Sequence, residues 1–177
     1  RMEVADLLFC LNMFTEDSLR ERGAPAEKIV PVSRGAAPQP AQRPRRRPDG
    51  PFTFLFVGLF GVRKGGPVLI EACRRLDPGV RVLVAGDVAE DVRALVAGAP
   101  DAMTFLGFVK DMAAVYAQSD ALVFPSLEEG GPKVCYEAAA FALPMVTTAM
   151  GGGRIMRDGE TGCVVPPADA EALAAAM

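Results

Sequence analysis

From residue 51 onward, short apolar runs alternate with longer segments of mixed polarity. The runs are rich in Val, Phe and Leu and show no polar alternation, which is typical of strands buried on both faces of a sheet. The predicted strands are 52–57, 81–86, 103–106, 121–124, 145–149 and 163–166, and the predicted helices are 67–76, 89–97, 112–119, 133–142 and 168–177. Strands that alternate with helices in this way form a parallel sheet, because each connection must cross over the sheet.

This rhythm predicts an α/β fold, namely a Rossmann-like, doubly wound parallel sheet with helices on both faces. In such sheets, ligands bind beyond the carboxyl ends of the strands, at the point where the strand order reverses. We therefore expect the loops after strands 52–57, 81–86, 121–124 and 145–149 to line one site.

The first fifty residues have a different pattern. We predict a buried strand with a short lead-in at 3–11, a helix that is capped by Thr15-Glu16-Asp17 and runs to about Arg22, and a second strand at 28–32. The stretch that follows is rich in proline and arginine. Arg43 and the run 45–47 suggest a basic patch for nucleic acid or a membrane. The interleaved prolines oppose a folded basic surface and no aromatic residue is interleaved for stacking, so a solvated interdomain linker is favoured.

Composition excludes several classes of function. The chain has 177 residues, of which 50% are apolar and 23% are charged, which is enough to bury a core. A net charge of -3 gives no electrostatic case for nucleic-acid binding. The sequence has no histidine, which removes Ser-His and Cys-His nucleophiles and most transition-metal chemistry. Four widely spaced cysteines predict reduced, mostly buried thiols in a cytoplasmic protein. Neither a membrane-spanning apolar run nor a signal peptide is visible.

The stretch 120–146 carries the most chemistry. A buried strand ends at Pro125-Ser126, an acidic, glycine-containing loop follows, and a helix begins near Lys133. Helix N-termini present unpaired N–H groups and a positive dipole end, so this junction favours a phosphate. Glu129 and Glu137 bracket the turn, and a carboxylate can accept two hydrogen bonds from a vicinal diol, which suits a sugar nucleotide. The alternative is that Glu129 caps the helix and Glu137 lies on its solvated face.

The same stretch resembles a known family. The pattern Pro125-Ser126-x-x-Glu129-Gly130, with Glu137-Ala138 and Leu143-Pro144-Met145-Val146 behind it, is similar to the signature of retaining glycosyltransferases of family 4 (group 1). That signature is a glutamate, seven residues and a second glutamate. The resemblance implies one half of a two-domain GT-B architecture. It also implies that Glu129 sits near the donor hexose and that Glu137 holds the ribose hydroxyls.

A glycine-rich turn at 58–65 follows the first strand of the sheet. Its glycines, Gly58 and Gly61 among them, let the backbone approach a phosphate, while Lys64 adds a mobile charge and Arg63 a bidentate fork. The turn resembles the family's G-R-L-x-x-x-K-G, in which Arg and Lys grip the diphosphate. Leu59 stands at the arginine position, and whether Arg63 replaces that arginine is left open. A surface basic pair is the alternative, which the helix dipole disfavours.

Further segments resemble the family less closely. Phe108 and Val109 stand where family members flank the nucleotide base. Gly130 and Gly131 replace the usual G-F-G and still allow the backbone to approach the donor. The glycines at 151–153 resemble a G-G-x-x-E loop with arginine near the glutamate position, and no role is transferred to them beyond shaping the loop. Asp120 is expected to be structural.

The resemblance implies that residues 51–177 are a donor-binding domain, truncated at its C-terminus, and that 1–50 are the end of the preceding domain plus a linker. We expect it to bind a UDP-, GDP- or ADP-sugar, with Glu129 and Lys64 as catalytic residues and with no cofactor or metal. Both chain ends look cut, so most of the acceptor domain is expected to be missing. The isolated chain should then bind nucleotide and transfer little sugar.

Two other functions stay open at this point. One is an isomerase like the nucleotide-sugar epimerases, which share the architecture but usually place histidines in the site. The other is a non-catalytic module that binds a sugar nucleotide, which Leu59 and the altered glycine loop favour. The acceptor is unknown, no nucleic-acid partner is expected, and membrane contact through the absent domain is left open.

Overall fold

The computed structural model describes residues 4–11, 13–32, 35–36, 50–152 and 155–177. The main feature of the fold is one six-stranded sheet in the order β5-β4-β3-β6-β7-β8, in which every neighbouring pair is parallel. Its strands are β3 (Phe52–Val57), β4 (Val80–Ala85), β5 (Met103–Gly107), β6 (Ala121–Phe124), β7 (Met145–Thr148) and β8 (Gly162–Val165). The predicted doubly wound, Rossmann-like α/β fold is confirmed.

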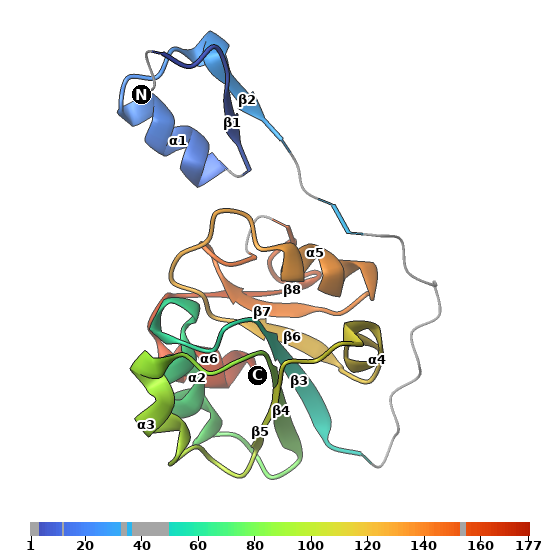
Figure 1. Cartoon of the computed structure of the whole chain (residues 1–177). Helices are drawn as coiled ribbons and strands as arrows, with labels where there is room; N and C mark the ends of the chain where they lie inside the picture. The colour runs from blue at the N-terminus through green and yellow to red at the C-terminus, as the bar shows by residue number, and fades with distance from the viewer. Residues whose placement is uncertain (1–3, 12, 33–34, 37–49, 153–154) are drawn as a thin grey trace.

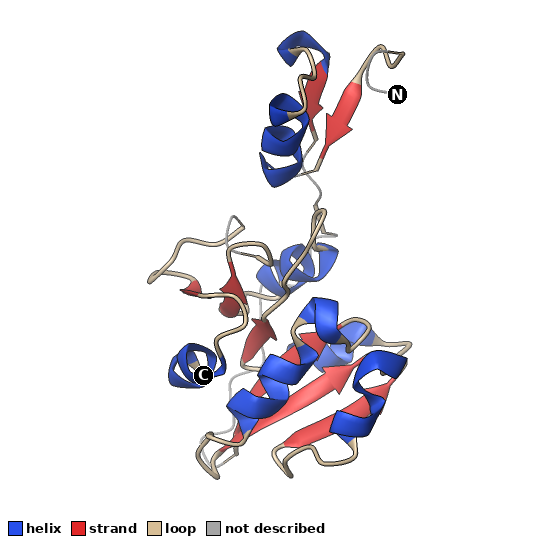
Figure 2. Cartoon of the chain, turned by 90° about the vertical axis from the view of Figure 1, so that its left-hand side faces the viewer, coloured by secondary structure: helices blue, strands red, loops and turns tan. Residues whose placement is uncertain are grey.

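Helices cover both faces of this sheet (Figure 1). They are α2 (Gly66–Cys73), α3 (Arg93–Val96), α4 (Met112–Ala117), α5 (Lys133–Ala140) and α6 (Ala170–Ala176), with 3-10 turns at Val62–Lys64 and Glu90–Val92. On one face α2 packs against both α3 and α6, and α4 and α5 lie on the other face (Figure 2). Because both faces are covered, β6 and β7 are buried at every position, and continuous apolar runs are what such strands require.

The strand order reverses between β3 and β6. From β3 the chain moves outward through β4 to β5, and then returns to add β6 on the other side of β3. Asp120 fixes this return, because its carboxylate accepts a hydrogen bond from the Thr53 amide at 2.8 Å and its own amide donates to the Thr53 carbonyl at 2.7 Å. The structural role expected for Asp120 is therefore supported. The helices that follow β3 and β6, α2 and α5, lie on opposite faces of the sheet (Figure 1), and in such sheets this switch point forms a crevice at the carboxyl ends of the strands.

A smaller unit precedes the sheet. β1 (Leu8–Cys10) and β2 (Ile29–Pro31) pair in parallel, with α1 (Met13–Glu21) and a 3-10 turn (Ala26–Lys28) between them. Its small core contains Cys10, Ala24 and Ile29. On the outside, Phe9 is 64% exposed.

Strands 52–57 and 121–124 were predicted residue for residue, whereas three local predictions were wrong. β1 is only three residues long, since only those residues find partners in β2. The residues Thr15-Glu16-Asp17 lie inside α1 and do not cap it; Glu16 sits in the first turn, where an acidic side chain favours the helix dipole, and pairs with Arg20. The helix predicted at 89–97 is a 3-10 turn and one helical turn, because Val92 is the only fully buried apolar residue of that segment and cannot anchor a longer helix.

Two further predictions concern cysteines and membranes. The four cysteines are free, three of them buried and Cys163 exposed. Among the described residues, no helix has the length and apolar character needed to cross a bilayer. The arginines predicted to form a solvated linker, Arg43 and those at 45–47, lie outside the described residues.

Candidate functional site

The loops after β3 and β6 meet at the crevice. Gly65 makes this contact possible, because a Cβ atom there would lie only 2.2 Å from the Pro125 carbonyl oxygen, and its φ of +75° is one that side-chain-bearing residues rarely adopt. The Leu127 amide donates to the Arg63 carbonyl at 2.9 Å, which ties the loops together. The backbone of one loop thus fixes the position of the other.

This contact places Lys64 against Glu129. The Lys64 ammonium donates to Glu129 Oε1, and their side chains are only 16% and 7% exposed. The Ser126 hydroxyl, on a fully buried residue, donates to the same oxygen at 2.8 Å, the shortest of its contacts. Lys64 also lies 4.9 Å from the centre of the Phe124 ring, within the range of a cation–π interaction. Opposite charges compensate each other here, as the low exposure requires.

Glu137 lies one helical turn inside α5 and is also held. Tyr116 Oη donates to Glu137 Oε2 at 3.0 Å, and the Lys133 ammonium lies 3.0 Å from Oε1. The Tyr116 ring is buried and stacks on Phe141, with centroids 5.2 Å apart and planes 18° apart. Burial, and then the negative charge of Glu137, raise the pKa of Tyr116, so its hydroxyl stays protonated and donates.

The alternative interpretation of the two glutamates is not supported. Helix α5 has Pro132 as its N-cap and no side-chain cap, so Glu129 does not cap it. The side chain of Glu137 is 28% exposed and accepts a hydrogen bond from Tyr116 of α4, so it is not simply a solvated surface position.

A hollow of about 290 Å³ lies at the carboxyl ends of β3, β4 and β5. Its walls are mainly apolar and comprise Val57, Gly58, Leu59, Ala85, Gly86, Asp87, Phe108, Val109 and Met112. Gly86 lets two of these loops touch, since a Cβ atom there would lie 2.2 Å from the Gly58 carbonyl oxygen. Phe108 is 81% exposed, so its ring is available to a flat ligand in the hollow. The two residues predicted to flank a base, Phe108 and Val109, therefore line one hollow.

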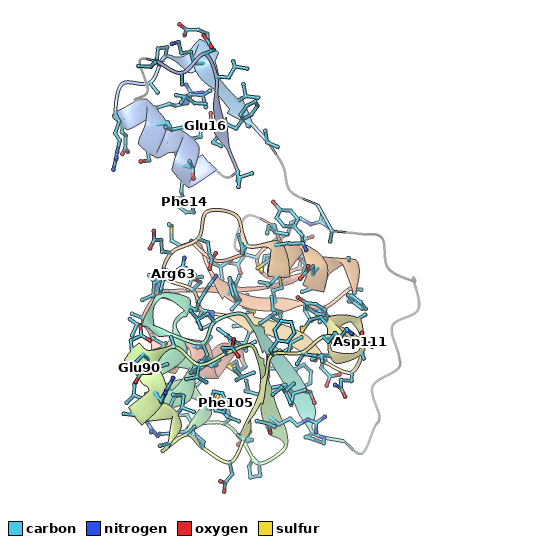
Figure 3. The ribbon with its side chains drawn as sticks, in the orientation of Figure 1. Phe14, Glu16, Arg63, Glu90, Phe105 and Asp111 are labelled. Carbon is cyan, nitrogen blue, oxygen red and sulfur yellow. The ribbon has the colours of Figure 1, made fainter. Side chains whose placement is uncertain are left out.

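A second hollow, of about 240 Å³, lies between the N-terminal unit and the loops after β6 and β7. Its lining includes Phe14 from α1, Gly131 and Pro132 at the start of α5, and Met150. Figure 3 shows Phe14 pointing from α1 toward the larger unit and Arg63 at the side of the larger unit. The Arg63 side chain is exposed, while its carbonyl is the one that binds Leu127.

The remaining predicted glycines have structural contacts. The Gly61 carbonyl accepts from the Gly66 amide at 2.9 Å, closing the glycine turn at the start of α2. Gly131 lies at the second hollow with a φ of +134°, and Gly130 has open space where a Cβ would be. The Gly151 and Gly152 amides donate to Thr148 Oγ1 and Thr147 Oγ1, so this glycine turn packs on the end of β7. Gly153 and Arg154 lie outside the described residues.

Two site residues were missed from the sequence. Ser126 was part of the quoted motif but received no role, and Tyr116 was only one position of a predicted helix. Their signal is topological, since each contacts a carboxylate that arrives from another segment. Within the part of the chain that the structure describes, no group of three or more Cys, Asp or Glu side chains could hold a metal ion.

Comparison with known proteins decides the family. The sequence pattern of the family described as "Glycosyl transferases group 1" matches residues 51–177, which is the whole of the larger unit. The chain belongs to the group 1 glycosyltransferases.

Relatives of this group 1 glycosyltransferase chain include a glycogen synthase of Mycobacterium tuberculosis, 32% identical over 193 residues that cover 98% of the chain and 45% of the relative. The D-rhamnosyltransferase WbpZ of Pseudomonas aeruginosa is 36% identical over 135 residues, covering 72% of the chain and 35% of that protein. The chain therefore spans about half the length, or less, of the curated relatives that it matches.

Solved structures share the fold. A sucrose-phosphate synthase of Thermosynechococcus elongatus superposes with a TM-score of 0.81 and 28% identity, covering 99% of the chain and 49% of that protein. Anabaena HepE, solved in complex with UDP and glucose, superposes with a TM-score of 0.80 and 20% identity, covering 97% of the chain and 52% of HepE. At 20% identity the second comparison supports the Rossmann-like fold alone.

Proposed function

We propose that this chain is the donor-binding part of a retaining glycosyltransferase that transfers a hexosyl group from a nucleoside diphosphate sugar to an acceptor. The observation that carries the proposal is the meeting of Lys64 and Glu129 at the point where the strand order reverses. A cation for a diphosphate and a carboxylate for sugar hydroxyls lie there side by side, in the crevice where such sheets bind ligands.

Each part of a sugar nucleotide has a matching group in this arrangement. The diphosphate lies near Lys64, with the exposed Arg63 guanidinium within reach along the same turn. The N-terminus of α5 has no side-chain cap, so its backbone N–H groups are oriented toward the loop and favour negative charge. Glu137 accepts from the ribose diol, and Glu129 accepts from hexose hydroxyls.

The base occupies the hollow that Phe108 and Val109 line. Met112 of α4 lines that hollow, and Tyr116 lies one turn further along the same helix and bonds to Glu137. Helix α4 thus lines the hollow for the base with Met112 and contacts the carboxylate for the ribose through Tyr116. The two sites are therefore close together, as the short distance between base and ribose requires. HepE has been solved with UDP and with UDP-glucose, so uridine is the first base to test, followed by guanosine and adenosine.

The chemistry proposed for the site is departure of the nucleoside diphosphate. The bond between the anomeric carbon and the β-phosphate oxygen breaks, and negative charge accumulates on that oxygen. Lys64 and the backbone N–H groups at α5 stabilise this charge electrostatically. The acceptor hydroxyl then attacks the anomeric carbon from the same face and gives its proton to the departing β-phosphate oxygen, so the anomeric configuration is retained. The acceptor is supplied through the part of the longer protein that the curated relatives have and this chain does not cover.

Titration calorimetry of the chain with UDP, GDP and ADP tests the proposal. We expect one nucleotide to bind, and we expect Glu137→Ala and Lys64→Ala each to weaken its binding about 10- to 100-fold, because each removes a charge-assisted hydrogen bond worth about 1.5–3 kcal/mol. Glu160→Ala is the matched control, since Glu160 is a 62% exposed carboxylate in a surface ion pair with Arg157.

The proposal is overturned if a chain with native circular dichroism binds none of the three nucleotides. Nucleotide binding that is indifferent to Glu137→Ala and Lys64→Ala would instead place the ligand elsewhere on the molecule. Binding that depends on both residues, with no transfer by a full-length protein whose Glu129 is intact, would favour the non-catalytic module.

A further inference from the structure

Tyr116 presents its hydroxyl to one oxygen of Glu137 from a buried, rigid position. The residue is 2% exposed, its ring stacks on Phe141, and Oη lies 3.0 Å from Glu137 Oε2. Its helix begins firmly, because the Asp111 side chain accepts from the Ala114 amide at the N-cap. A ring held in this way has little freedom to move its hydroxyl.

Glu137 needs such a restraint if it is to accept from two hydroxyls at once. A glutamate side chain has three rotatable bonds, and ordering it costs conformational entropy. Its other contact, Lys133, is 65% exposed and belongs to the same helix at i−4. Exposed pairs of this type contribute little and hold no fixed geometry. The restraint on the orientation of the Glu137 carboxylate therefore comes mainly from Tyr116.

We propose that Tyr116 is a positioning residue for ribose recognition, in that its hydroxyl fixes the Glu137 carboxylate so that the carboxylate accepts from the 2′- and 3′-hydroxyls of the nucleotide. This inference rests on the proposed function, which assigns Glu137 to the ribose. Tyr116 itself does not touch the donor. Tyr116 orders the Glu137 carboxylate before the nucleotide binds, so binding does not have to supply the entropic cost of ordering it.

The substitution Tyr116→Phe removes the hydroxyl and keeps the ring and its stacking on Phe141. We expect it to weaken UDP binding by the 177-residue chain about 3- to 10-fold, as measured by titration calorimetry, which corresponds to loss of one hydrogen bond. The decisive ligand is 2′,3′-dideoxyuridine 5′-diphosphate, which keeps the base and the diphosphate but has no diol. For this ligand Tyr116→Phe should change the affinity by less than twofold. If the chain selects GDP or ADP, the corresponding dideoxy analogue is used.

Tyr136→Phe is the matched control, because it makes the same change on the only other tyrosine of the chain. Tyr136 lies on α5 beside Glu137 in sequence but lines the second hollow. Tyr136→Phe should leave the binding of UDP and of its dideoxy analogue unchanged. In the double variant Tyr116→Phe/Glu137→Ala, the loss should equal that of Glu137→Ala alone, since the tyrosine acts through the carboxylate.

Equal weakening of UDP and the dideoxy analogue by Tyr116→Phe would overturn the inference, because it would indicate general damage to the domain. Unchanged UDP binding in Tyr116→Phe would also overturn it. The variant Glu137→Ala distinguishes these failures from failure of the proposed function. If the proposed function is wrong, Glu137→Ala itself leaves the binding of UDP intact in a folded chain.

Discussion

The pair formed by Lys64 and Glu129 makes an asymmetric prediction for stability. The Glu129 side chain is the less exposed of the two, at 7% against 16%. Lys64→Met leaves a nearly buried carboxylate with the Ser126 hydroxyl as a remaining donor. Glu129→Gln leaves an ammonium group that still lies over the Phe124 ring and can shift toward water on a flexible stem.

Removing one partner of a fully buried pair costs about 3–5 kcal/mol. We reduce this for partial exposure and expect Lys64→Met to lower the free energy of unfolding by about 2–3 kcal/mol, and Glu129→Gln by about 1 kcal/mol. The double variant loses both charges and should cost less than the sum of the single changes by about 1 kcal/mol or more. In a chain of this size the corresponding fall in Tm is about 2–4 °C per kcal/mol.

Urea unfolding followed by far-ultraviolet circular dichroism measures these differences, since the chain has no tryptophan to report by fluorescence. The matched surface pair is Arg157 with Glu160, at 76% and 62% exposure, for which Arg157→Met should cost less than about 0.5 kcal/mol. Additive single effects, or a greater cost for Glu129→Gln than for Lys64→Met, would refute the reasoning.

Three further results are expected. Glu129→Gln should tighten binding of UDP several-fold in calorimetry, because it removes a negative charge beside the diphosphate; weaker binding would contradict this placement of the phosphates. Gly65→Ala should lower nucleotide affinity at least tenfold or prevent folding, because its Cβ would lie 2.2 Å from the Pro125 carbonyl oxygen. Gly23→Ala is the control, since Gly23 has a similar φ of +80° but open space around its Cβ position, so this variant carries the backbone strain without the steric clash. Burial raises the pKa of Cys73 to about 12, so at pH 8 a disulfide reagent should modify exposed Cys163 quickly and Cys73 only on unfolding; rapid modification of two or more thiols in the native chain would contradict the burial.

The sheet could be predicted from the sequence because its strands are buried on both faces. A run such as Phe52–Val57 has no polar alternation and therefore marks its own bounds. The helix predicted at 89–97 was too long because this segment has helix propensity but no buried face to hold a longer helix against the sheet. In the structure, Asp91 of this segment accepts a hydrogen bond from the Val62 amide. Strand and helix type were therefore more predictable than the length of weakly buried elements.

The candidate site was only partly predictable, for a different reason. Lys64 and Glu129 were each proposed from local motifs, but their direct pairing depends on how the two loops pack at Gly65. Tyr116 has no local signal, since it reaches Glu137 across 21 residues of sequence. Contacts between segments that are distant in sequence depend on the order of the strands in the sheet. The pattern of hydrophobic residues predicts the strands themselves, but it does not specify which side chains meet where the strand order reverses.

The join between β3 and β6 also sets when a ligand can first be bound during folding. Thr53 and Asp120, which seal this join, are 67 residues apart, so closing it requires one of the long-range chain encounters that slow the folding of parallel sheets. Neither half of the sheet alone carries both Lys64 and Glu129. A nucleotide that needs both would therefore stabilise only the fully wound sheet, by about 2.7 kcal/mol at 100 times its Kd. Recovery of nucleotide binding during refolding would then report the joining of the two halves.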